Sequence, residues 1–420
     1  MPLDDYYKSY SFQLINLDVF FSTLSVFVLL FISPYLFSID FLKPFKDALS
    51  DYEITDIYFS KILPELDIPI ETDILVVNTG VPTRNGFKEL SDVNYAQIVK
   101  ALQNFEPSTI AIDHEFTIQE DEKNYDYVKQ VLSSWDNIIV RKDLIKESKY
   151  FTKTNEISPV VEGVASGYGN FLIKRNKEHS TIRTFPPRVI LGKDTLTHIA
   201  VKAAQNFNPD AVERMLSRKY ETEVINYRGG HQKFEIIDAK QLYKGEFDPE
   251  MITNRIIIMG VVDTSGVSDE FNRTFYTPLN ESITGRTFPD MHGVIINSNI
   301  VSMILTDEYF KRVPQWVSFA ITFFVCYINM LFFGYIGWRN KKWYEIAALL
   351  TFVFESVLLA IINVNLVNAY QIQINFTASI IAAALSIPVF ELYTDSFKPF
   401  FEWILRTFFG VKPKSIFDYE

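Results

Sequence analysis

The chain has 420 residues, a formal net charge of −11 and a single cysteine, with 37 Phe and 22 Tyr. The acidic balance argues against a nucleic-acid partner, because such a partner requires a basic, aromatic-laced patch and none stands outside the apolar segments. The length allows two or three domains, and the lone Cys326 excludes a disulfide framework, so an ordinary hydrophobic core has to hold any outer domain.

The apolar residues gather in blocks near the two ends of the chain. The first block predicts a transmembrane helix over residues 18–38 and contains "VFFSTLSVFVLLFISPYLF". This uncharged run, at about 1.5 Å per residue, roughly matches the hydrocarbon thickness of a bilayer. Its leader is acidic and no small-x-small cleavage site follows it, which favours a retained anchor over a secretory signal. Three more blocks predict transmembrane helices over residues 313–338, 344–367 and 371–393.

The basic residues near these blocks predict the orientation of the chain. The loop "RNKKW" between the second and third blocks holds three basic residues and the tail holds four, whereas the loop between the third and fourth blocks holds none. Short basic loops stay in the cytoplasm. We therefore expect residues 1–17 and the tail 394–420 to be cytoplasmic and residues 39–312 to lie outside. Lys43 and Lys46, just after the first block, oppose this orientation mildly.

The outer segment reads as alternating strands and helices. "DILVVNT" (73–79), "STIAID" (108–113) and "RIIIMG" (255–260) are short apolar runs, typical of strands buried on both faces. Residues 92–105 have apolar positions at helical spacing, with Asp92 as the N-cap. Single helices between consecutive strands favour parallel pairing. The sequence therefore predicts an α/β extracytoplasmic domain with a largely parallel central sheet, plus a four-helix transmembrane region.

Two further features follow in the second half of this segment. Gly229 and Gly230 suit a hairpin turn between two strands. The stretch 291–305 predicts a helix that runs almost directly into the second apolar block. A shift in the outer domain is therefore expected to pass mechanically to the membrane helices.

Asp113 and His114 end a predicted strand, at the position where open parallel sheets bind ligands. Together with Glu115 they suggest a metal site, but alternation along a strand sends neighbouring side chains to opposite faces. A strand-end acid that caps a turn is the favoured alternative. The five histidines show no paired metal-ligand spacing, so we expect no metal and no other cofactor.

The loop after residues 255–260 is rich in Gly, Asp and Thr but lacks the lysine and the glycine spacing of a phosphate-binding loop. Asp263 and Asp269 either coordinate a hard cation or shape the loop by bonding backbone N–H groups, and the second interpretation is favoured. Arg183 and Arg228 are each a candidate anchor for a ligand carboxylate or phosphate. The alternative for Arg183 is a salt bridge within the protein. The alternative for Arg228 is a hairpin arginine that faces water.

We take Asp113, Arg183, Arg228 and Asp269 as the candidate ligand-binding residues. The sequence has no G-x-S-x-G elbow, and its Ser-Gly turns have no histidine that the sequence singles out beside them. We therefore expect no catalytic residues and no enzymatic activity.

Polar residues inside the apolar blocks indicate contacts between helices. A carboxyl group such as Glu355 costs several kcal/mol in mid-membrane if it is charged and faces lipid. We expect it to be protonated, paired inside the bundle or in contact with a partner, and Asn329 is a second candidate for such a contact. The small residues Ala378, Ala382 and Ser386 form a close-packing stripe, which suits a partner helix and packing within this chain equally well.

Six segments occur in an order and spacing that resemble a known family: "DILVVNTG", "AIDHEF", "GYGNFLIKRNKEHSTIR", "VINYRGG", "NRIIIMGVVDTSGVSDEFNRTFYTP" and "MHGVIINSNIVSMIL". The family is the CHASE domain of the second type, an extracellular sensory domain of bacterial adenylate cyclases, histidine kinases and related receptors. The resemblance covers roughly residues 40–390, and one span before the domain with three after it is the family's usual arrangement.

The chain departs from the family pattern at two places. The first strand commonly ends in acidic residues there, whereas Val77, Asn78, Thr79 and Gly80 stand here. A cyclase, kinase or phosphatase module would follow the last span, whereas only about 27 residues follow it here. The resemblance therefore implies a sensory domain without a fused cytoplasmic effector.

We expect an integral protein of the bacterial cytoplasmic (inner) membrane whose periplasmic domain senses a ligand or an envelope component. Its signal would pass to a separate protein partner. The alternative is a non-catalytic structural or scaffolding subunit of a multi-protein cell-envelope complex. Membrane lipid is an expected contact, and a homo-oligomer is a further option.

Overall fold

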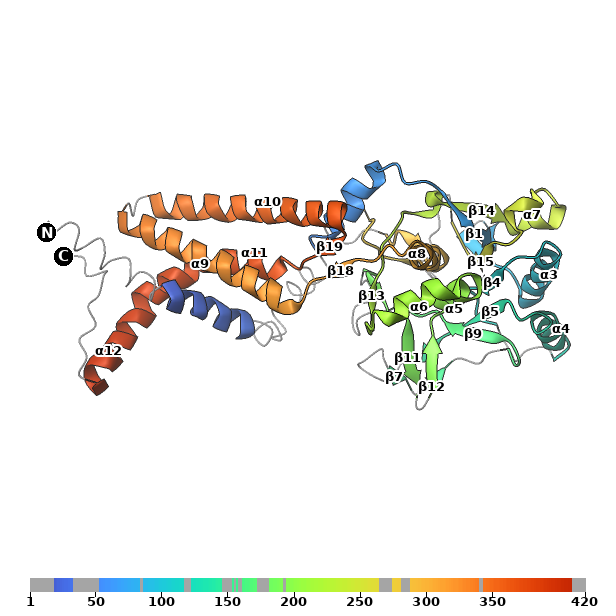
Figure 1. The fold of residues 1–420 in the computed structure, drawn as a ribbon, viewed down its shortest axis with the longest axis horizontal. Coiled ribbons are helices and arrows are strands. Elements are labelled where there is room, and N and C mark those ends of the chain that lie inside the picture. The colour runs from blue at the N-terminus through green and yellow to red at the C-terminus, as the bar shows by residue number, and fades with distance from the viewer. Residues whose placement is uncertain are drawn as a thin grey trace. The chain divides into compact units, whose positions relative to one another are not determined.

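The computed structural model describes residues 19–32, 53–83, 86–116, 122–145, 153–154, 156–157, 161–171, 181–191, 194–263, 274–280, 288–339 and 343–409. The chain divides into two compact units, shown with their elements in Figure 1. One unit is Asp56–Phe310, and the other combines Met1–Thr55 with Lys311–Glu420.

A six-stranded sheet forms the centre of the Asp56–Phe310 unit. Its strands stand in the order β14-β1-β15-β4-β5-β9, and every neighbouring pair is parallel. The prediction of a largely parallel sheet is therefore confirmed. The strands are β1 (Glu71–Asn78), β4 (Thr109–Ile112), β5 (Ile138–Lys142), β9 (Ala165–Tyr168), β14 (Phe234–Asp238) and β15 (Ile256–Gly260).

Helices cover both faces of this sheet, so its strands are apolar on both sides (Figure 1). On one face, Leu75 and Val77 of β1 share a hydrophobic core with three helices, α3 (Asp92–Gln103), α4 (Glu122–Leu132) and α7 (Ala239–Lys244). The other face packs against α5 (Ile199–Phe207) and α8 (Gly293–Thr306), and α6 (Pro209–Ser217) packs on these two. Helix α8 is buried at every residue from Gly293 to Ile304.

The start of α3 differs by one residue from the predicted helix. Ser91 is the N-cap, and its Oγ accepts a hydrogen bond from the backbone N–H of Asn94 at 3.4 Å. Asp92 is instead the first helical residue, where its negative charge favours the positive end of the helix dipole. The side chain of Asp92 is therefore available for another contact.

The hairpin predicted at Gly229 and Gly230 is not formed, and that prediction is wrong. The strand before the glycines, β13 (Glu223–Val224), pairs with β10 (Thr184–Phe185), whereas β14 after them pairs with β1. The physical reason is that each strand finds a longer-range partner. The side-chain oxygen of Asn299 on α8 accepts hydrogen bonds from the backbone N–H groups of Arg228 and Gly229, at 2.7 and 3.3 Å. These N–H groups are therefore bonded to α8 instead of to each other's strand across a hairpin.

Short strands complete this unit. A hairpin follows β1 directly, formed by β2 (Gly80–Thr83) and β3 (Gly86–Glu89). The remaining strands are β6 (Leu144–Ile145) with β8 (Glu156–Ile157), β7 (Lys153–Thr154) with β11 (Arg188–Leu191) and β12 (Asp194–Thr197), and β16 (Thr274–Phe275) with β17 (Met291–His292). The short helical turns are η2 (Tyr58–Ile62), η3 (Leu63–Glu65), η4 (His231–Lys233) and η5 (Pro249–Met251).

Long apolar helices form the other unit: α9 (Gln315–Arg339), α10 (Tyr344–Tyr370) and α11 (Thr377–Leu392). The π-helical turn η7 (Tyr393–Phe397) then leads into α12 (Lys398–Phe409). Among the described residues, three helical segments are long and apolar enough to cross a membrane: Gln315–Gly334, Tyr344–Tyr370 and Thr377–Phe400. Of the first predicted span, the described part is the shorter apolar helix Val19–Ile32, so the four-helix count stays a prediction.

The last span begins later than its predicted start at residue 371. Gln371 ends α10 in the left-handed conformation, with φ of 54°. The next residues form β19 (Ile372–Gln373), which pairs in parallel with β18 (Lys311–Arg312). The helix then starts at Thr377, whose backbone N–H donates to the side chain of Asn375. An uninterrupted apolar run does not reveal such a turn, because every residue in it remains apolar or uncharged.

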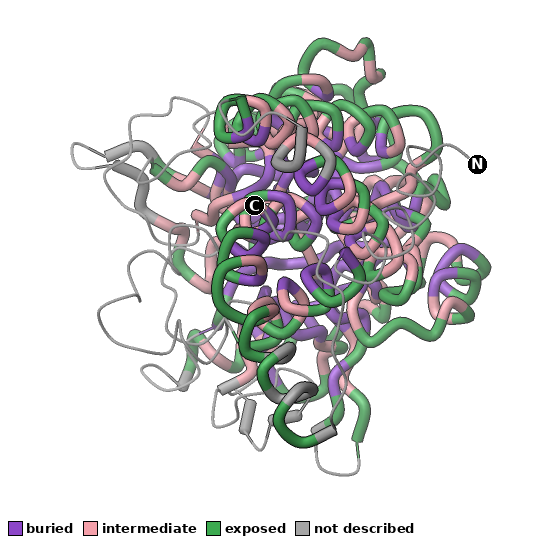
Figure 2. The backbone as a smooth tube through the Cα atoms, turned by 90° about the vertical axis from the view of Figure 1, so that its left-hand side faces the viewer, coloured by how far each residue is buried: buried purple, intermediate pink, exposed green. Residues whose placement is uncertain are grey.

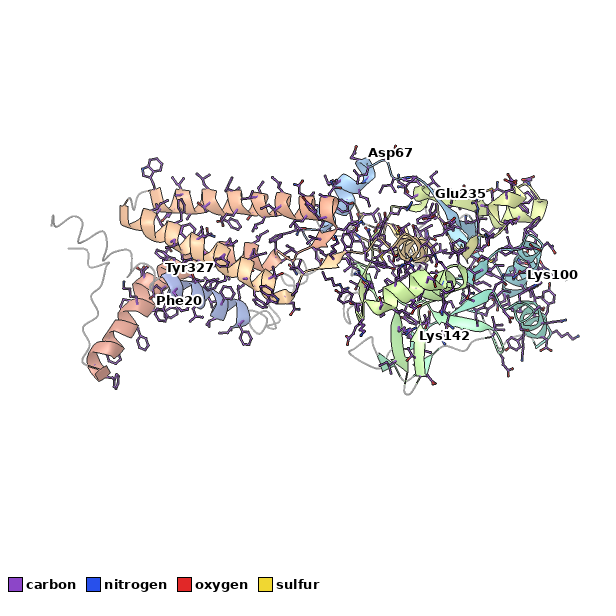
Figure 3. All side chains as sticks on the ribbon, viewed as in Figure 1. Phe20, Asp67, Lys100, Lys142, Glu235 and Tyr327 are labelled. Carbon is purple, nitrogen blue, oxygen red and sulfur yellow. The ribbon has the colours of Figure 1, made fainter. Side chains whose placement is uncertain are left out.

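Burial along the helices of this unit is one-sided, as the tube in Figure 2 shows by colour. Helices α9 and α11 pack together through buried residues that include Cys326, Ala382 and Phe390. Phe20, labelled with Tyr327 in Figure 3, meets Phe323 of α9 edge to face, and Phe323 stacks on Tyr327. By contrast, α10 exposes apolar side chains along most of its length, which is typical of a surface that lipid covers.

Candidate functional site

The polar residues that end the central strands gather at one edge of the sheet. Because all six strands are parallel, their carboxyl ends lie on the same side. In open parallel sheets this edge is where ligands bind. The residues that stand there are Asn78 at the end of β1, Asp113 and His114 after β4, Arg141 and Lys142 in β5, and Asp238 in β14. We call this set, with the side chains bonded to it, the carboxyl edge.

A buried ion pair lies at the centre of the carboxyl edge. Nη1 of Arg141 donates to Oδ1 of Asp113 at 2.7 Å, and the two side chains are only 9% and 4% exposed. The same guanidinium also binds Asp143 with two bonds, from Nε at 2.6 Å and from Nη2 at 3.1 Å. Burial opposes the charge, but Asp113 and Asp143 raise the pKa of Arg141 above its ordinary value. The guanidinium is therefore permanently charged and shared between two strand ends.

Helix α8 contributes directly to this ion pair. Nδ2 of Asn297 donates to Oδ2 of Asp113 at 3.3 Å. Helix α8 begins close to this carboxylate: a Cβ added to Gly293, its first residue, would lie 3.4 Å from the same oxygen and 3.3 Å from the ring of Phe275. A carboxylate at a helix N-terminus is stabilised by the helix dipole. Asp113 therefore joins β4, β5 and α8.

Asn78 shows why an amide stands where the family commonly has an acid. Its Oδ1 accepts backbone N–H groups from Gly80 at 3.0 Å and from Val262 at 2.9 Å. Its Nδ2 donates to Oδ1 of Asp238 at 2.8 Å. A carboxylate has no hydrogen to donate, and it would meet a second carboxylate at this position. The amide thus ties the ends of β1, β14 and β15 together without a charge.

His114 lies beside this network, between two carboxylates. Its Nδ1 is 2.7 Å from Oε1 of Glu89, and its Nε2 is 2.7 Å from Oδ1 of Asp92. The ring stacks on Tyr95 with the centroids 4.2 Å apart. The side chains of Asp113 and His114 point to different partners, in line with strand alternation. No group of three or more His, Cys, Asp and Glu side chains within the described part of the chain has the arrangement of a metal site.

A second histidine, His198, is fully buried beside the sheet. Its Nδ1 accepts the backbone N–H of Ala200 at 3.3 Å, and its ring packs edge to face on Tyr168 and Phe185. Burial, together with the nearby charge of Arg141, lowers the pKa of His198 to about 3. The ring is therefore neutral at any physiological pH and fills space at the start of α5.

The structure does not bring the predicted ligand-binding residues together. Arg183 binds Asp56 with two bonds, from Nε at 2.9 Å and from Nη2 at 2.5 Å. Arg228 lies at the opposite end of β1 from the carboxyl edge, with Nη1 3.6 Å from Oε2 of Glu71. Asp269 lies outside the described residues. Among the candidates that the structure describes, Asp113 is the one that stands at the carboxyl edge. Ligand binding by any of the four residues stays a prediction.

Two residues of the network, Arg141 and Asn297, were not singled out from the sequence. Arg141 directly follows the apolar residues of "NIIVRK", so the rule that selected Asp113 at a strand end applies to it as well. Asn297 carries no such signal, because it stands among apolar residues in a buried helix and its partner is 184 positions away.

In the unit of long apolar helices, Asn329 and Glu355, the two residues predicted to make contacts, bond to each other. Nδ2 of Asn329 on α9 donates to Oε2 of Glu355 on α10 at 2.7 Å. Of the predicted stripe of small residues on α11, Ala382 is buried against this chain and Ser386 lies 3.5 Å from Sγ of Cys326, whereas Ala378 is exposed. Packing within the chain therefore accounts for the Asn329–Glu355 contact and for two of the three residues of the stripe. Contact with a partner at either place stays a prediction.

The fold and the site define a protein with a parallel α/β domain, a charged network at the carboxyl edge of its sheet, and helices long and apolar enough to cross a membrane. The model of one family, the CHASE2 domain, matches residues 25–336. The chain therefore belongs to the CHASE2 domain family, which is a family of sensory domains. Comparison with curated proteins and with solved structures gave no match.

Proposed function

We propose that this protein is a sensor of the bacterial cytoplasmic membrane that signals through a separate protein partner. In this proposal the Asp56–Phe310 unit lies outside the cytoplasm, and an anionic ligand or envelope component binds at the carboxyl edge. Membership of a sensory domain family and the three apolar helices support the proposal. We further propose that the protein is not an enzyme.

The observation that carries this proposal is the bond between Asp113 and α8. A ligand carboxylate or phosphate that accepts from Nη1 of Arg141 competes with Asp113, because Asp113 accepts from the same atom. Release of Asp113 removes the acceptor of Asn297. Helix α8 ends at Thr306, and α9 begins at Gln315 in the same chain. A change at the carboxyl edge thus reaches the helix that precedes α9 in the chain, with residues 307–314 between them.

Mass spectrometry of the full chain, purified in mild detergent, tests the ligand and the partner together. We expect the native protein to retain a small anionic molecule and a stoichiometric partner protein. Arg141→Lys keeps the positive charge but loses the planar fork, so the small molecule should be lost. Arg183→Lys is the matched control, because the fork of Arg183 binds Asp56 instead. Loss of the molecule from the control but not from Arg141→Lys would contradict the proposed site.

The orientation has its own prediction. Cysteines introduced at Asn340 and Ser415 should react with a membrane-impermeant maleimide only after the inner membrane is breached. A cysteine at Lys233 should react in intact cells whose outer membrane has been permeabilised. Native Cys326 is buried between helices and gives a low background. The reverse pattern of labelling would overturn the topology.

One observation favours the alternative, a scaffolding subunit of a cell-envelope complex. The arginines predicted to anchor a ligand are engaged by acids of this chain: Arg183 by Asp56, and Arg228 by Glu71. Internal pairs of this kind stabilise a rigid surface. A stoichiometric protein partner without any small molecule, in the same mass-spectrometry experiment, would select this role over sensing.

A further inference from the structure

The geometry around His114 requires hydrogen on both ring nitrogens. Each nitrogen lies 2.7 Å from a carboxylate oxygen, Nδ1 from Glu89 and Nε2 from Asp92. A neutral imidazole carries one N–H, so one of its nitrogens would direct a lone pair at a carboxylate oxygen. Carboxyl groups ordinarily titrate near pH 4 and imidazole near 6.5, so a shared proton belongs on the ring. An imidazolium held by two anions satisfies both contacts at once.

The two carboxylates come from different elements. Glu89 is the last residue of β3, in the hairpin that follows β1, whereas Asp92 is the first residue of α3. The hydroxyl of Tyr95 donates to Oε1 of Glu89 at 3.0 Å and lies 2.7 Å from Oγ1 of Thr79. The imidazolium of His114, at the end of β4, thus joins the hairpin to the helix.

The ring is shielded from water on several sides. Tyr95 stacks on one face at 4.2 Å, and Phe116 meets the ring at 4.9 Å in an edge-to-face contact. The residue is 6% exposed. The charged or titratable groups around it are Glu89 from β3, Asp92 and Tyr95 from α3, and its chain neighbours Asp113, which binds Arg141, and Glu115. Within the described part of the chain, the ion pairs of His114 are with Glu89 and Asp92 alone.

We propose that His114 is a proton-binding site that clamps the end of β4 to Glu89 and Asp92, where the β2–β3 hairpin meets α3, and loosens when the ring loses its proton. Deprotonation leaves two carboxylates beside one N–H, so one of the two contacts with the ring loses its hydrogen bond. Glu89 retains the hydroxyl of Tyr95 on α3, and Asp92 retains the helix N-terminus. The loosening therefore occurs between the end of β4 and the segment that joins the hairpin to the helix. This inference deepens the proposed function, on which it rests, by naming the proton as a stimulus at the carboxyl edge.

The direction of the pH dependence follows from the contacts. Burial works against the charged ring, but the hydrogen bonds and charges of Asp92 and Glu89 outweigh it and raise the pKa of His114 above 6.5. A raised pKa in the folded state means that the clamp is complete below the ordinary histidine pKa of about 6.5 and is lost as the pH rises through the higher folded value. The clamp is thus closed in a mildly acidic envelope and opens in an alkaline one.

Hydrogen exchange of the full chain in detergent, followed by mass spectrometry, tests the clamp. After correction for the intrinsic pH dependence of exchange, peptides covering residues 80–95 should lose protection by about tenfold or more between roughly pH 5.5 and pH 9, the scale of a lost hydrogen bond to a charged group. His114→Gln cannot take up a proton and should show no such transition. His231→Gln, at an exposed histidine of η4, should retain the transition of the native protein.

A second pair of variants keeps the test decisive if His114→Gln fails to fold. Glu89→Gln and Asp92→Asn each remove one anion from the ring, so each should move the midpoint of the transition to lower pH and preserve its existence. A native midpoint that neither variant moves, or a transition that His114→Gln retains, would overturn the clamp. These readouts are local to the hairpin and need no ligand or partner. Failure of the sensory proposal therefore shows in the mass-spectrometry experiment, and failure of the clamp shows here.

Discussion

Replacing Arg141 with methionine is expected to lower the free energy of unfolding of the Asp56–Phe310 unit by about 3–5 kcal/mol, because the change strands Asp113 in a site where it is 4% exposed. The attraction within a buried pair is largely offset by the cost of removing both charges from water. Removal of one partner exposes that cost, since the remaining carboxylate stays buried beside Asn297, whose Nδ2 donates to it at 3.3 Å. Urea unfolding of the full chain in detergent, read by pulse proteolysis, measures the change.

Lys129→Met is the matched control for this measurement. It also breaks an ion pair, with Glu162, but that carboxylate is 79% exposed and remains hydrated when its partner is lost. The expected change is therefore much smaller than for Arg141→Met. If both variants lower stability by the same small amount, the Arg141–Asp113 pair is not the buried link described above.

A double variant separates the loss of an attraction from the burial of a lone charge. Arg141→Met combined with Asp113→Asn removes both charges and leaves an amide beside Asn297. Stability should recover toward the native value, since replacing both partners of a buried pair is often close to neutral. A double variant as unstable as Arg141→Met alone would show that Asp113 is not the group left uncompensated.

Much of the α/β unit could be predicted from local patterns. The apolar runs at 73–79, 108–113 and 255–260 correspond to β1, β4 and β15, because strands buried on both faces have few polar residues. The helical spacing after Asp92 corresponds to α3, and its Ala96, Val99 and other apolar residues lie in the core. These features depend on neighbours within a few positions. The order of the strands does not, and β15 inserts between β1 and β4 although it follows them by more than a hundred residues.

The carboxyl edge could be predicted in position but not in its contacts. Asp113 was found because a strand end in a parallel sheet is a recurrent binding position. Its partners Arg141 and Asn297 are 28 and 184 positions away, and nothing local pairs them with it, although Arg141 also stands at a strand end. The glycine pair at 229–230 failed as a hairpin signal for the same reason. Turn chemistry is local, whereas the partners of β13 and β14 are chosen by the whole sheet.

Gly167 is a residue whose role appears only in three dimensions. It lies in β9, in the segment "SGYGN", which reads as a turn in the sequence. In the structure, the backbone of α5 passes directly over it. A Cβ added there would lie 2.6 Å from Cα and 2.9 Å from the backbone nitrogen of Ile199. A flexible side chain can move away from such a contact, but the first turn of a buried helix can do so only by shifting as a unit.

Gly167→Ala is therefore expected to lower the free energy of unfolding by about 1–3 kcal/mol, the usual cost of forcing extra volume into a packed interior. The shift should concentrate at β9 and the start of α5, where Tyr168 also bridges to His198. Hydrogen exchange of α5 should accelerate, while α3 on the opposite face should remain protected. Ser166→Ala, one position earlier and adding no atom, should stay within about 0.5 kcal/mol of the native protein. Equal stability of Gly167→Ala and Ser166→Ala would contradict the close approach of α5, and with it the register that sets His198 beside Arg141.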